Sequence, residues 1–146
     1  MSVNKLNNMG TRSITRIYAL TESGTKEHLV SFYRQYDGYP EGHGKELAEI
    51  LNKAKYVNGL SGGDSRVLGN YFNGSGCGAA SIISILKDEP GGIYIIPKGR
   101  NDMWEEWTYE VIFNDMDKSI NLTVKDTREG ISDYFTGTPK EFLAKH

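Results

Sequence analysis

Hydrophobic and polar residues alternate in two neighbouring segments near the start of the chain, and this pattern predicts two β-strands. The segments are TRSITRIYAL (11–20) and EHLVSFYRQY (27–36), and both are rich in β-branched and aromatic residues. The turn chemistry between them, TESGTK, places Gly24 where a positive φ is expected. We therefore expect an antiparallel hairpin here.

From Pro40 onward the hydrophobic period changes to that of a helix. One apolar stripe recurs at i, i+3, i+4 and i+7, formed by Leu47, Ile50, Leu51 and Ala54. A second segment, CGAASIISILKDE (77–89), is apolar almost all round and predicts a buried helix that ends before Pro90-Gly91-Gly92. Residues 57–76, which separate the two helices, contain six glycines and little periodicity. A loop of this length within one domain is unusual and is often functional.

The C-terminal part of the chain reads mostly as β-structure. GIYIIP predicts a short central strand, and EWTYEVIF places Trp107, Tyr109, Val111 and Phe113 on one face. NDMDK makes a turn into SINLTVKD, and GISDYF predicts one more short strand. The sequence after it, Thr138-Pro139-Lys140-Glu141, predicts a helix start closed by a capping box.

These elements predict one α+β domain in the order ββ-α-loop-α-βββ-(β)-α. Residues 1–8 are polar and unpatterned and are expected to form a flexible lead-in, so the domain comprises residues 9–146. Its sheet should be mainly antiparallel, with about five or six strands. Two helices and a short C-terminal helix should cover one face of it.

Composition restricts the function. The chain has 146 residues, a net charge of −2 and no long basic run, so there is no strong nucleic-acid signal. Cys77 is the only cysteine, which excludes an internal disulfide or a cysteine-based zinc site and fits a reducing compartment. No apolar stretch approaches a membrane span and no signal-peptide core is present, so we expect a cytoplasmic protein without a membrane partner. The sequence predicts no cofactor and no metal site, and an aromatic-rich sheet is compatible with homo-oligomerisation.

The densest group of chemically capable residues is YRQYDGYPEGHG, residues 33–44. Arg34 should lie at the end of the buried strand face, next to the turn that Asp37 begins. Gly42 and Gly44 are poor helix formers in a first helical turn, and their presence indicates close approach by a backbone, a side chain or a ligand. In a structural interpretation Arg34 pairs with Asp37 and His43 hydrogen-bonds a nearby carbonyl. In a functional one, Arg34, Tyr39 and His43 surround a helix N-terminus that binds an anion.

A second glycine-rich segment, NGSGCGAAS (73–81), opens the predicted buried helix, and its backbone amides could form an anion-binding nest. It has neither the lysine of a Walker A loop nor the spacing of a Rossmann fingerprint. We expect the two segments to meet in space and to bind one negatively charged guest. The predicted ligand-binding residues are Arg12, Arg34, Asp37, Tyr39, His43, Gly44, Arg66, Asn73, Gly76 and Gly78.

The motifs MGTRSITRIY (9–18) and YRQYDGYPEGHGKELAEIL (33–51) resemble a family of small uncharacterised proteins common in phage and bacterial genomes. The similarity extends to the Pro-Gly-Gly-Ile-Tyr strand at 90–94 and to the Thr-Pro-x-Glu-Phe-Leu end at 138–143. It covers most of the chain from residue 9. The resemblance implies a phage-type origin and a role in phage–host conflict, within the host cytoplasm, and it brings no established reaction.

Three classes of function remain. The first is a small counter-defence protein that sequesters an anionic, nucleotide-like ligand, using glycine-rich amides, arginines and aromatic rings. The second is an inhibitor that contacts a host protein through acidic and aromatic patches. The third is a cysteine-dependent hydrolase with Cys77 as nucleophile, His43 as base and Asp37 as orienting group. For Cys77 a small, inert, buried residue is the favoured alternative, and for Trp104 and Trp107 packing over the sheet is favoured over contact with a partner.

Overall fold

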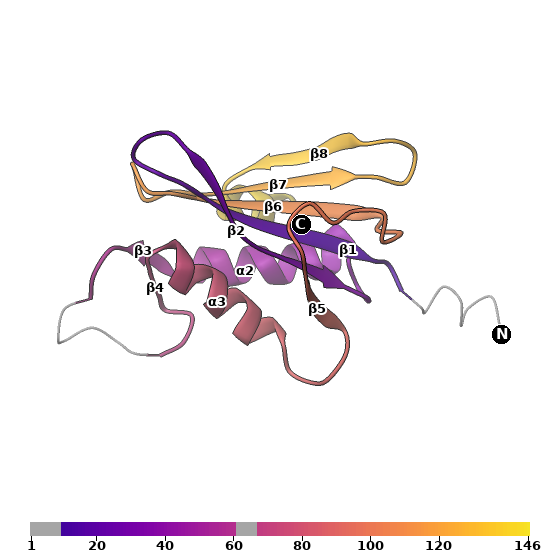
Figure 1. Ribbon diagram of the computed structural model, residues 1–146, viewed down its shortest axis with the longest axis horizontal. Coiled ribbons are helices and arrows are strands. Elements are labelled where there is room, and N and C mark those ends of the chain that lie inside the picture. The colour runs from indigo at the N-terminus through magenta and orange to yellow at the C-terminus, as the bar shows by residue number, and fades with distance from the viewer. Residues whose placement is uncertain (1–9, 61–66) are drawn as a thin grey trace.

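The computed structural model describes residues 10–60 and 67–146, which form a curved sheet with helices packed against one of its faces (Figure 1). The strands are β1 (Ser13–Leu20), β2 (Lys26–Arg34), β3 (Lys55–Val57), β4 (Tyr71–Asn73), β5 (Ile93–Ile96), β6 (Trp107–Asn114), β7 (Ile120–Asp126) and β8 (Ser132–Gly137). The helical elements are one turn of π-helix, η1 (Pro40–Gly44), and the α-helices α2 (Lys45–Lys53), α3 (Ser75–Leu86) and α4 (Pro139–Lys145).

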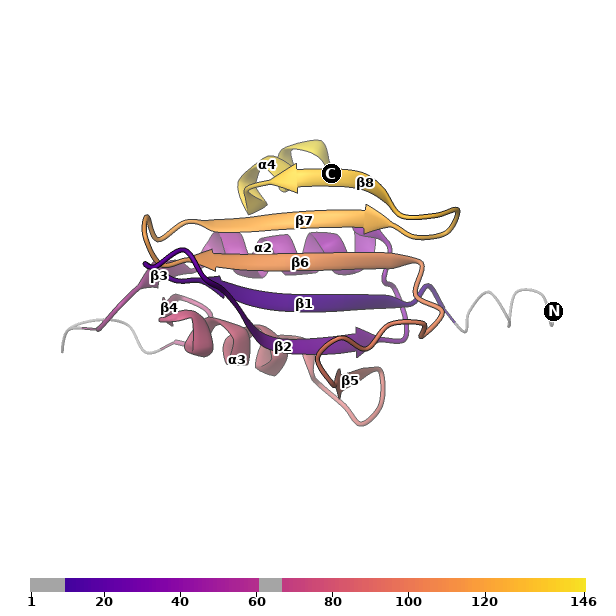
Figure 2. The same ribbon diagram turned by 45° about the horizontal axis from the view of Figure 1, so that its top comes forward.

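The main sheet has six strands in the order β5-β2-β1-β6-β7-β8 (Figure 2). Every neighbouring pair is antiparallel except β1 and β6, which run parallel. The two hairpins, β1–β2 and β6–β7, therefore lie side by side at the centre. The sequence-based α+β prediction, with a mainly antiparallel sheet and helices on one face, is confirmed.

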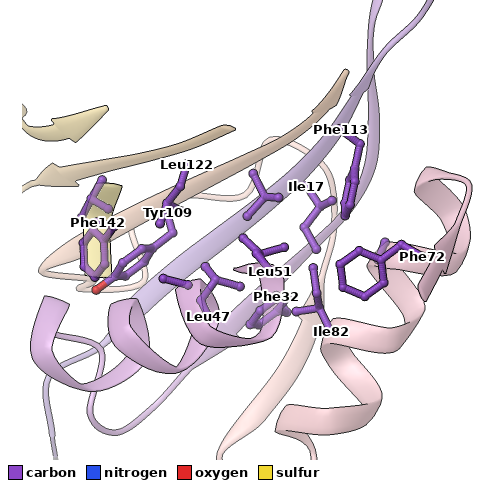
Figure 3. Close-up of a cluster of buried hydrophobic side chains, with 14 of the residues drawn as sticks. Ile17, Phe32, Leu47, Leu51, Phe72, Ile82, Tyr109, Phe113, Leu122 and Phe142 are labelled. Atoms are coloured by element: carbon purple, nitrogen blue, oxygen red, sulfur yellow. The ribbon is translucent and has the colours of Figure 1, made fainter. Parts of the chain in front are cut away.

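The strand alternation decides which face the helices cover. Trp107, Tyr109, Val111 and Phe113 all point from β6 toward the helices and are buried, as their spacing predicts. Leu47 and Leu51 of α2 and Ile82 of α3 meet them from the other side (Figure 3). The core is thus a layer of aromatic and aliphatic side chains between one sheet face and the helices.

The C-terminal helix begins as predicted. The backbone N–H of Glu141 donates to Thr138 Oγ1 at 3.1 Å, and the N–H of Thr138 donates to Glu141 Oε1 at 2.8 Å. These two bonds satisfy amides that have no partner within the helix. The cap fixes α4 so that Phe142 is fully buried against the end of α2.

The prediction that GIYIIP forms a central strand is wrong, because β5 pairs only with β2 and lies at the edge of the sheet. Tyr94 and Ile95 are 47% and 60% exposed. The isoleucines of β5 lie on two different faces of the sheet. Ile93 packs on the main core, and Ile96 is buried on the opposite face, which we call the open face because the helices do not cover it. The segment 97–106 crosses that open face near the start of β1 (Figure 2), where the Arg16 guanidinium donates to the Arg100 carbonyl at 2.9 Å.

The stretch predicted as a loop, residues 57–76, contains short strand structure at both ends. β3 and β4 pair in parallel, with Tyr56 opposite Phe72. Both side chains are buried beside Phe113, with ring centroids 5.2 and 5.7 Å from it. Two aromatic contacts with the core therefore hold the ends of this stretch together. Helix α3 is also less buried than its composition suggests, because Ile85 is 39% exposed.

Candidate functional site

The glycines of the 33–44 block allow close packing of the chain. A Cβ on Gly42 would lie 2.6 Å from the Asp37 carbonyl oxygen, and one on Gly44 would lie 2.8 Å from the Phe142 ring. Gly38 lies equally close to β1, and its carbonyl accepts a 2.6 Å hydrogen bond from the buried Tyr109 hydroxyl. The prediction of close approach is confirmed, and the approaching groups are backbone and side chains of the protein itself.

His43 is fully buried, at the centre of a polar network inside the core. Its Nδ1 lies 3.0 Å from Arg34 Nη1, and its Nε2 lies 2.7 Å from Thr15 Oγ1. Because a guanidinium can only donate, Nδ1 must be the acceptor, so Nε2 carries the proton and donates to Thr15. The second guanidinium nitrogen of Arg34 donates to Glu46 Oε1 at 3.0 Å.

The surroundings keep His43 neutral. Burial, and after it the positive charge of Arg34, lowers the pKa of His43 from 6.5 to about 3. The imidazole is also edge-on to Phe32 and Tyr109, with centroids 5.8 and 4.7 Å away. His43 therefore fixes η1 against the sheet and cannot reach a ligand or act as a base toward solvent.

Both interpretations of the 33–44 block need correction. In the structural one, Arg34 was expected to pair with Asp37, but it pairs with Glu46, while Asp37 accepts a long 3.4 Å bond from the Tyr39 hydroxyl. In the functional one, Arg34 and His43 were expected to face an anion, but each is occupied by the other. Thr15 and Glu46 complete this network and were missed. The only signal for Glu46 is its position one helical turn after His43.

The second glycine segment lies at the other end of the core. A Cβ on Gly78 would lie 2.6 Å from Phe113, whereas His43 contacts Tyr109, four residues earlier on β6. Four strand residues span about 13 Å. Figure 3 shows the same separation, with Tyr109 and Phe142 at one end and Phe72 and Phe113 at the other. The expectation that the two segments meet around one guest is therefore wrong.

The remaining predicted site residues are scattered. Asn73 accepts a 2.6 Å bond from the Gly59 amide, Gly76 has open space around it, and Arg12 contacts the Tyr33 hydroxyl on the open face. Arg66 lies outside the described residues. Cys77 is exposed, which contradicts the expected buried thiol. It belongs to the segment at the far end of the core from the sealed His43, so the geometry does not support the Cys77–His43–Asp37 arrangement.

A groove lies beside the 33–44 block, between α2 and the C-terminal half of α3, and we call it the acidic groove. Two adjoining hollows of about 380 and 620 Å³ make it up, and they share Glu46, Leu86 and Asp88. Its apolar lining residues are Ile50, Ile85, Leu86, Ile93 and Leu143. Its charged residues are the acids Asp37, Glu46, Glu49, Asp88 and Glu89 and the bases Arg34, Lys53 and Lys87.

The five carboxylates of the acidic groove outnumber its three basic groups, and two of those bases are already engaged. Arg34 is held by His43 and Glu46. The Lys87 ammonium donates to the carbonyls of Gly91 and Ile93 at 2.7 and 3.0 Å. The hollow that contains Arg34 and Asp37 is lined by four carboxylates and two basic groups, and this excess of negative charge disfavours the anion that the sequence suggested.

Comparison with known protein families, curated proteins and solved structures found no match to this chain. In residues 10–60 and 67–146, no group of three or more His, Cys, Asp or Glu side chains could hold a metal ion. No helix in the described part of the chain is long and apolar enough to cross a membrane. The site must therefore be interpreted from its own chemistry.

Proposed function

We propose that this protein is a binding module that takes a basic, amphipathic helical segment of a partner protein into the acidic groove, and that it acts by occluding that segment. The observation that carries the proposal is that apolar residues and an excess of carboxylates line the same groove. This is the second of the functions that the sequence favours, inhibition by protein–protein contact. The resemblance to phage proteins suggests a host protein as the partner.

The lining of the acidic groove has the chemistry that suits an amphipathic helix. Amphipathic helices bind by laying apolar side chains at i, i+3 and i+4 into a hydrophobic groove. Ile85, a lining residue that is 39% exposed, would lose its contact with water on binding, and burial of such a side chain is the main source of affinity. The carboxylates on the border would select lysine and arginine on the flanks of the incoming helix and would speed its association.

A peptide titration tests the proposal. The probe is a peptide of about 15 residues, roughly 22 Å as a helix, with leucines at helical spacing and lysines elsewhere. A second peptide, with glutamate at every lysine position, is the ligand control. We expect the basic peptide to bind and to weaken as salt is raised, because the rim charges are screened, and the acidic peptide not to bind.

Two matched charge reversals separate binding in the groove from attraction to the whole protein. Glu49→Lys with Asp88→Lys, the rim variant, reverses two carboxylates that line the acidic groove. Glu22→Lys with Glu27→Lys, the hairpin variant, makes the same change in net charge on the exposed β1–β2 hairpin. The rim variant should lose most of the affinity and the hairpin variant should keep it. Equal losses in both variants would mean that the peptide follows net charge, and the groove proposal would be wrong.

The open face of the sheet favours a second candidate function, the binding of an anionic, nucleotide-like ligand. Arg16 of β1 and Lys98 lie close enough to His28 that, after burial, their positive charges lower the pKa of this histidine. In the described residues neither cation has an acidic partner within ion-pair distance. The rings of Tyr33 and Tyr94 pack together on the same face, 6.3 Å apart. Tyr94 is exposed and Tyr33 is partly buried, and aromatic rings near cations suit a base and its phosphate.

Thermal shift against a panel of mononucleotides and cyclic nucleotides tests the second candidate, since a ligand that binds the folded state raises the Tm. We expect the shift to be lost in Arg16→Gln and kept in Lys45→Gln, which removes an exposed charge on α2. A panel without any stabilising nucleotide, or a shift that Arg16→Gln leaves intact, would rule out this face as the site.

A further inference from the structure

A separate pocket lies on the other side of the turn that ends β2, at the end of the sheet where β6 begins. It has a volume of about 450 Å³, and we call it the aromatic pocket. Its lining residues are Thr11, Tyr39, Pro40, Glu41, Glu106, Trp107, Arg128 and Tyr134. None of these residues lines the acidic groove, so the pocket is an independent feature of the surface.

Three aromatic side chains give the pocket its walls. Trp107 is buried at the back, and Tyr134 meets it edge to face, with the ring centroids 5.2 Å apart. Tyr39 and Tyr134 remain 39% and 42% exposed. The Tyr134 hydroxyl is held at 2.8 Å from His146 Nε2, which fixes its ring. The faces of such rings are electron-rich and attract cations.

One basic group of the protein itself already lies in the pocket, the guanidinium of Arg128. This guanidinium lies over the Trp107 ring, with its central carbon 4.8 Å from the centroid. Asp126 neutralises it through two hydrogen bonds of 3.0 and 2.7 Å. These bonds lower the pKa of Asp126 to about 2, so the pair stays ionised at neutral pH.

Two carboxylates in the pocket form no ion pair of their own among the described residues. Glu41 and Glu106 have no basic side chain within ion-pair distance in the described parts of the chain. Their charges reach the neighbouring groups: after burial, the negative charge of Glu41 raises the pKa of both Tyr109 and Tyr134. With Arg128 cancelled by Asp126, the pocket keeps a net negative charge beside exposed aromatic rings.

We propose that the aromatic pocket binds a basic side chain, the guanidinium of an arginine or the ammonium of a lysine, supplied by a partner. The cation would enter between the rings of Tyr39 and Tyr134, and its N–H groups would donate to Glu41 and Glu106. The apolar part of the side chain would lie against the rings, which shields the ion pairs from water and strengthens them. An anion or an uncharged polar group would be disfavoured by the same carboxylates.

The test uses the full-length protein and a ligand too small to occupy the groove. Nα-acetyl-arginine methylamide and the corresponding lysine compound are titrated while the indole N–H signal of Trp107 is followed by NMR, in a Trp104→Phe background that leaves one indole. We expect a saturable shift of this signal, and the relative strength of the two titrations identifies the preferred cation. The citrulline compound, which has the shape of arginine without its charge, should produce no saturable shift.

Two variants locate the site. Glu41→Gln with Glu106→Gln removes both charges with little change in shape and should weaken binding roughly tenfold, as expected for the loss of two ion pairs that solvent screens. Tyr39→Leu should weaken it by a smaller factor, and Glu22→Gln with Glu27→Gln should leave it unchanged. Equal binding of the citrulline compound, no saturable shift with either cation, or unaltered affinity in the Glu41/Glu106 variant would overturn the proposal. Each of these results leaves the peptide titration of the acidic groove unaffected.

Discussion

The protein should lose stability on mild acidification, and replacing His43 by glutamine should remove a large part of this loss. The imidazole is fully buried and neutral, and it donates from Nε2 to Thr15 while it accepts at Nδ1 from Arg34. A second proton would have to be placed on Nδ1, directly against the guanidinium. The other charged or titratable neighbours, Glu46 beyond Arg34 and Tyr109 on β6, do not offer Nδ1–H an acceptor.

The size of the effect follows from the two pKa values of His43. In the unfolded chain it titrates near 6.5 and in the folded protein near 3, so between these values the unfolded state binds one proton more. The stabilisation by neutral His43 is therefore complete above about pH 6.5 and is lost as the pH falls toward 3. One pKa unit corresponds to about 1.4 kcal/mol, so acidification from 6.5 to 5 should lower the free energy of unfolding by about 2 kcal/mol through this residue.

Urea unfolding at about pH 7 and pH 5 measures the difference. Glutamine has an amide oxygen to accept from Arg34 and an amide N–H to donate to Thr15, but it does not titrate. We expect the variant to be less stable than the natural protein at neutral pH, because it loses the ring contacts with Phe32 and Tyr109. Its stability should fall less on acidification, by about 2 kcal/mol. The carboxylates contribute equally to the pH dependence of stability in both proteins, so their contribution cancels in the comparison.

Ile82→Val provides the control, since it removes one buried methylene from α3 and should cost about 0.5–1.5 kcal/mol without touching the His43 network. This variant should retain the full pH dependence of the natural protein. If the glutamine variant instead shows the same fall between pH 7 and pH 5 as the natural protein, His43 titrates normally in the folded state. That result would refute a neutral imidazole that hydrogen-bonds to both Arg34 and Thr15.

Three further predictions concern stability and can be measured by the same unfolding assay. Thr15→Val should cost about 1–3 kcal/mol, because it leaves the buried His43 N–H without an acceptor, and Thr15→Ser, which keeps the hydroxyl, should cost less. Gly44→Ala should destabilise by about 1–3 kcal/mol, because its Cβ would lie 2.8 Å from a buried ring of α4; Gly76→Ala, with open space in the first turn of α3, should stabilise by about 0.5–1 kcal/mol. Thr138→Ala should cost about 1 kcal/mol through loss of the capping box. A neutral result for Thr15→Val or Gly44→Ala would contradict the packing described around η1.

Local pattern was sufficient for most of the fold. The alternation from Trp107 to Phe113 identified the buried face of β6, and the spacing of Leu47 and Leu51 identified the buried stripe of α2. What the pattern could not supply was the lateral order of the strands. The run Ile93–Ile96 would be equally apolar in a central strand and in an edge strand that packs Ile93 on the core and buries Ile96 on the other face. The position of β5 was therefore predicted wrongly.

The site was harder to infer, because the same residue types serve packing and binding. Arg34 and His43 are adjacent in the fold, as their clustering in the 33–44 block suggested, but they hydrogen-bond to each other. Their second partners are Glu46 for Arg34 and Thr15 for His43, and neither partner stands out in the sequence. The distance of Cys77 from this network depends on where α3 crosses the sheet, and no local signal encodes that position. The sequence did not predict the acidic groove, because its charged residues come from separate segments that meet only when α2 and α3 are packed in the fold.

The most direct test of the acidic groove is amide chemical-shift mapping with the basic leucine–lysine peptide. The account predicts that the perturbed amides cluster on α2 around Glu49 and Ile50 and on the end of α3 from Ile85 to Asp88, with little change on the open face of the sheet. Perturbations centred on β1, β6 and β7 instead, or spread evenly over the surface, would contradict it.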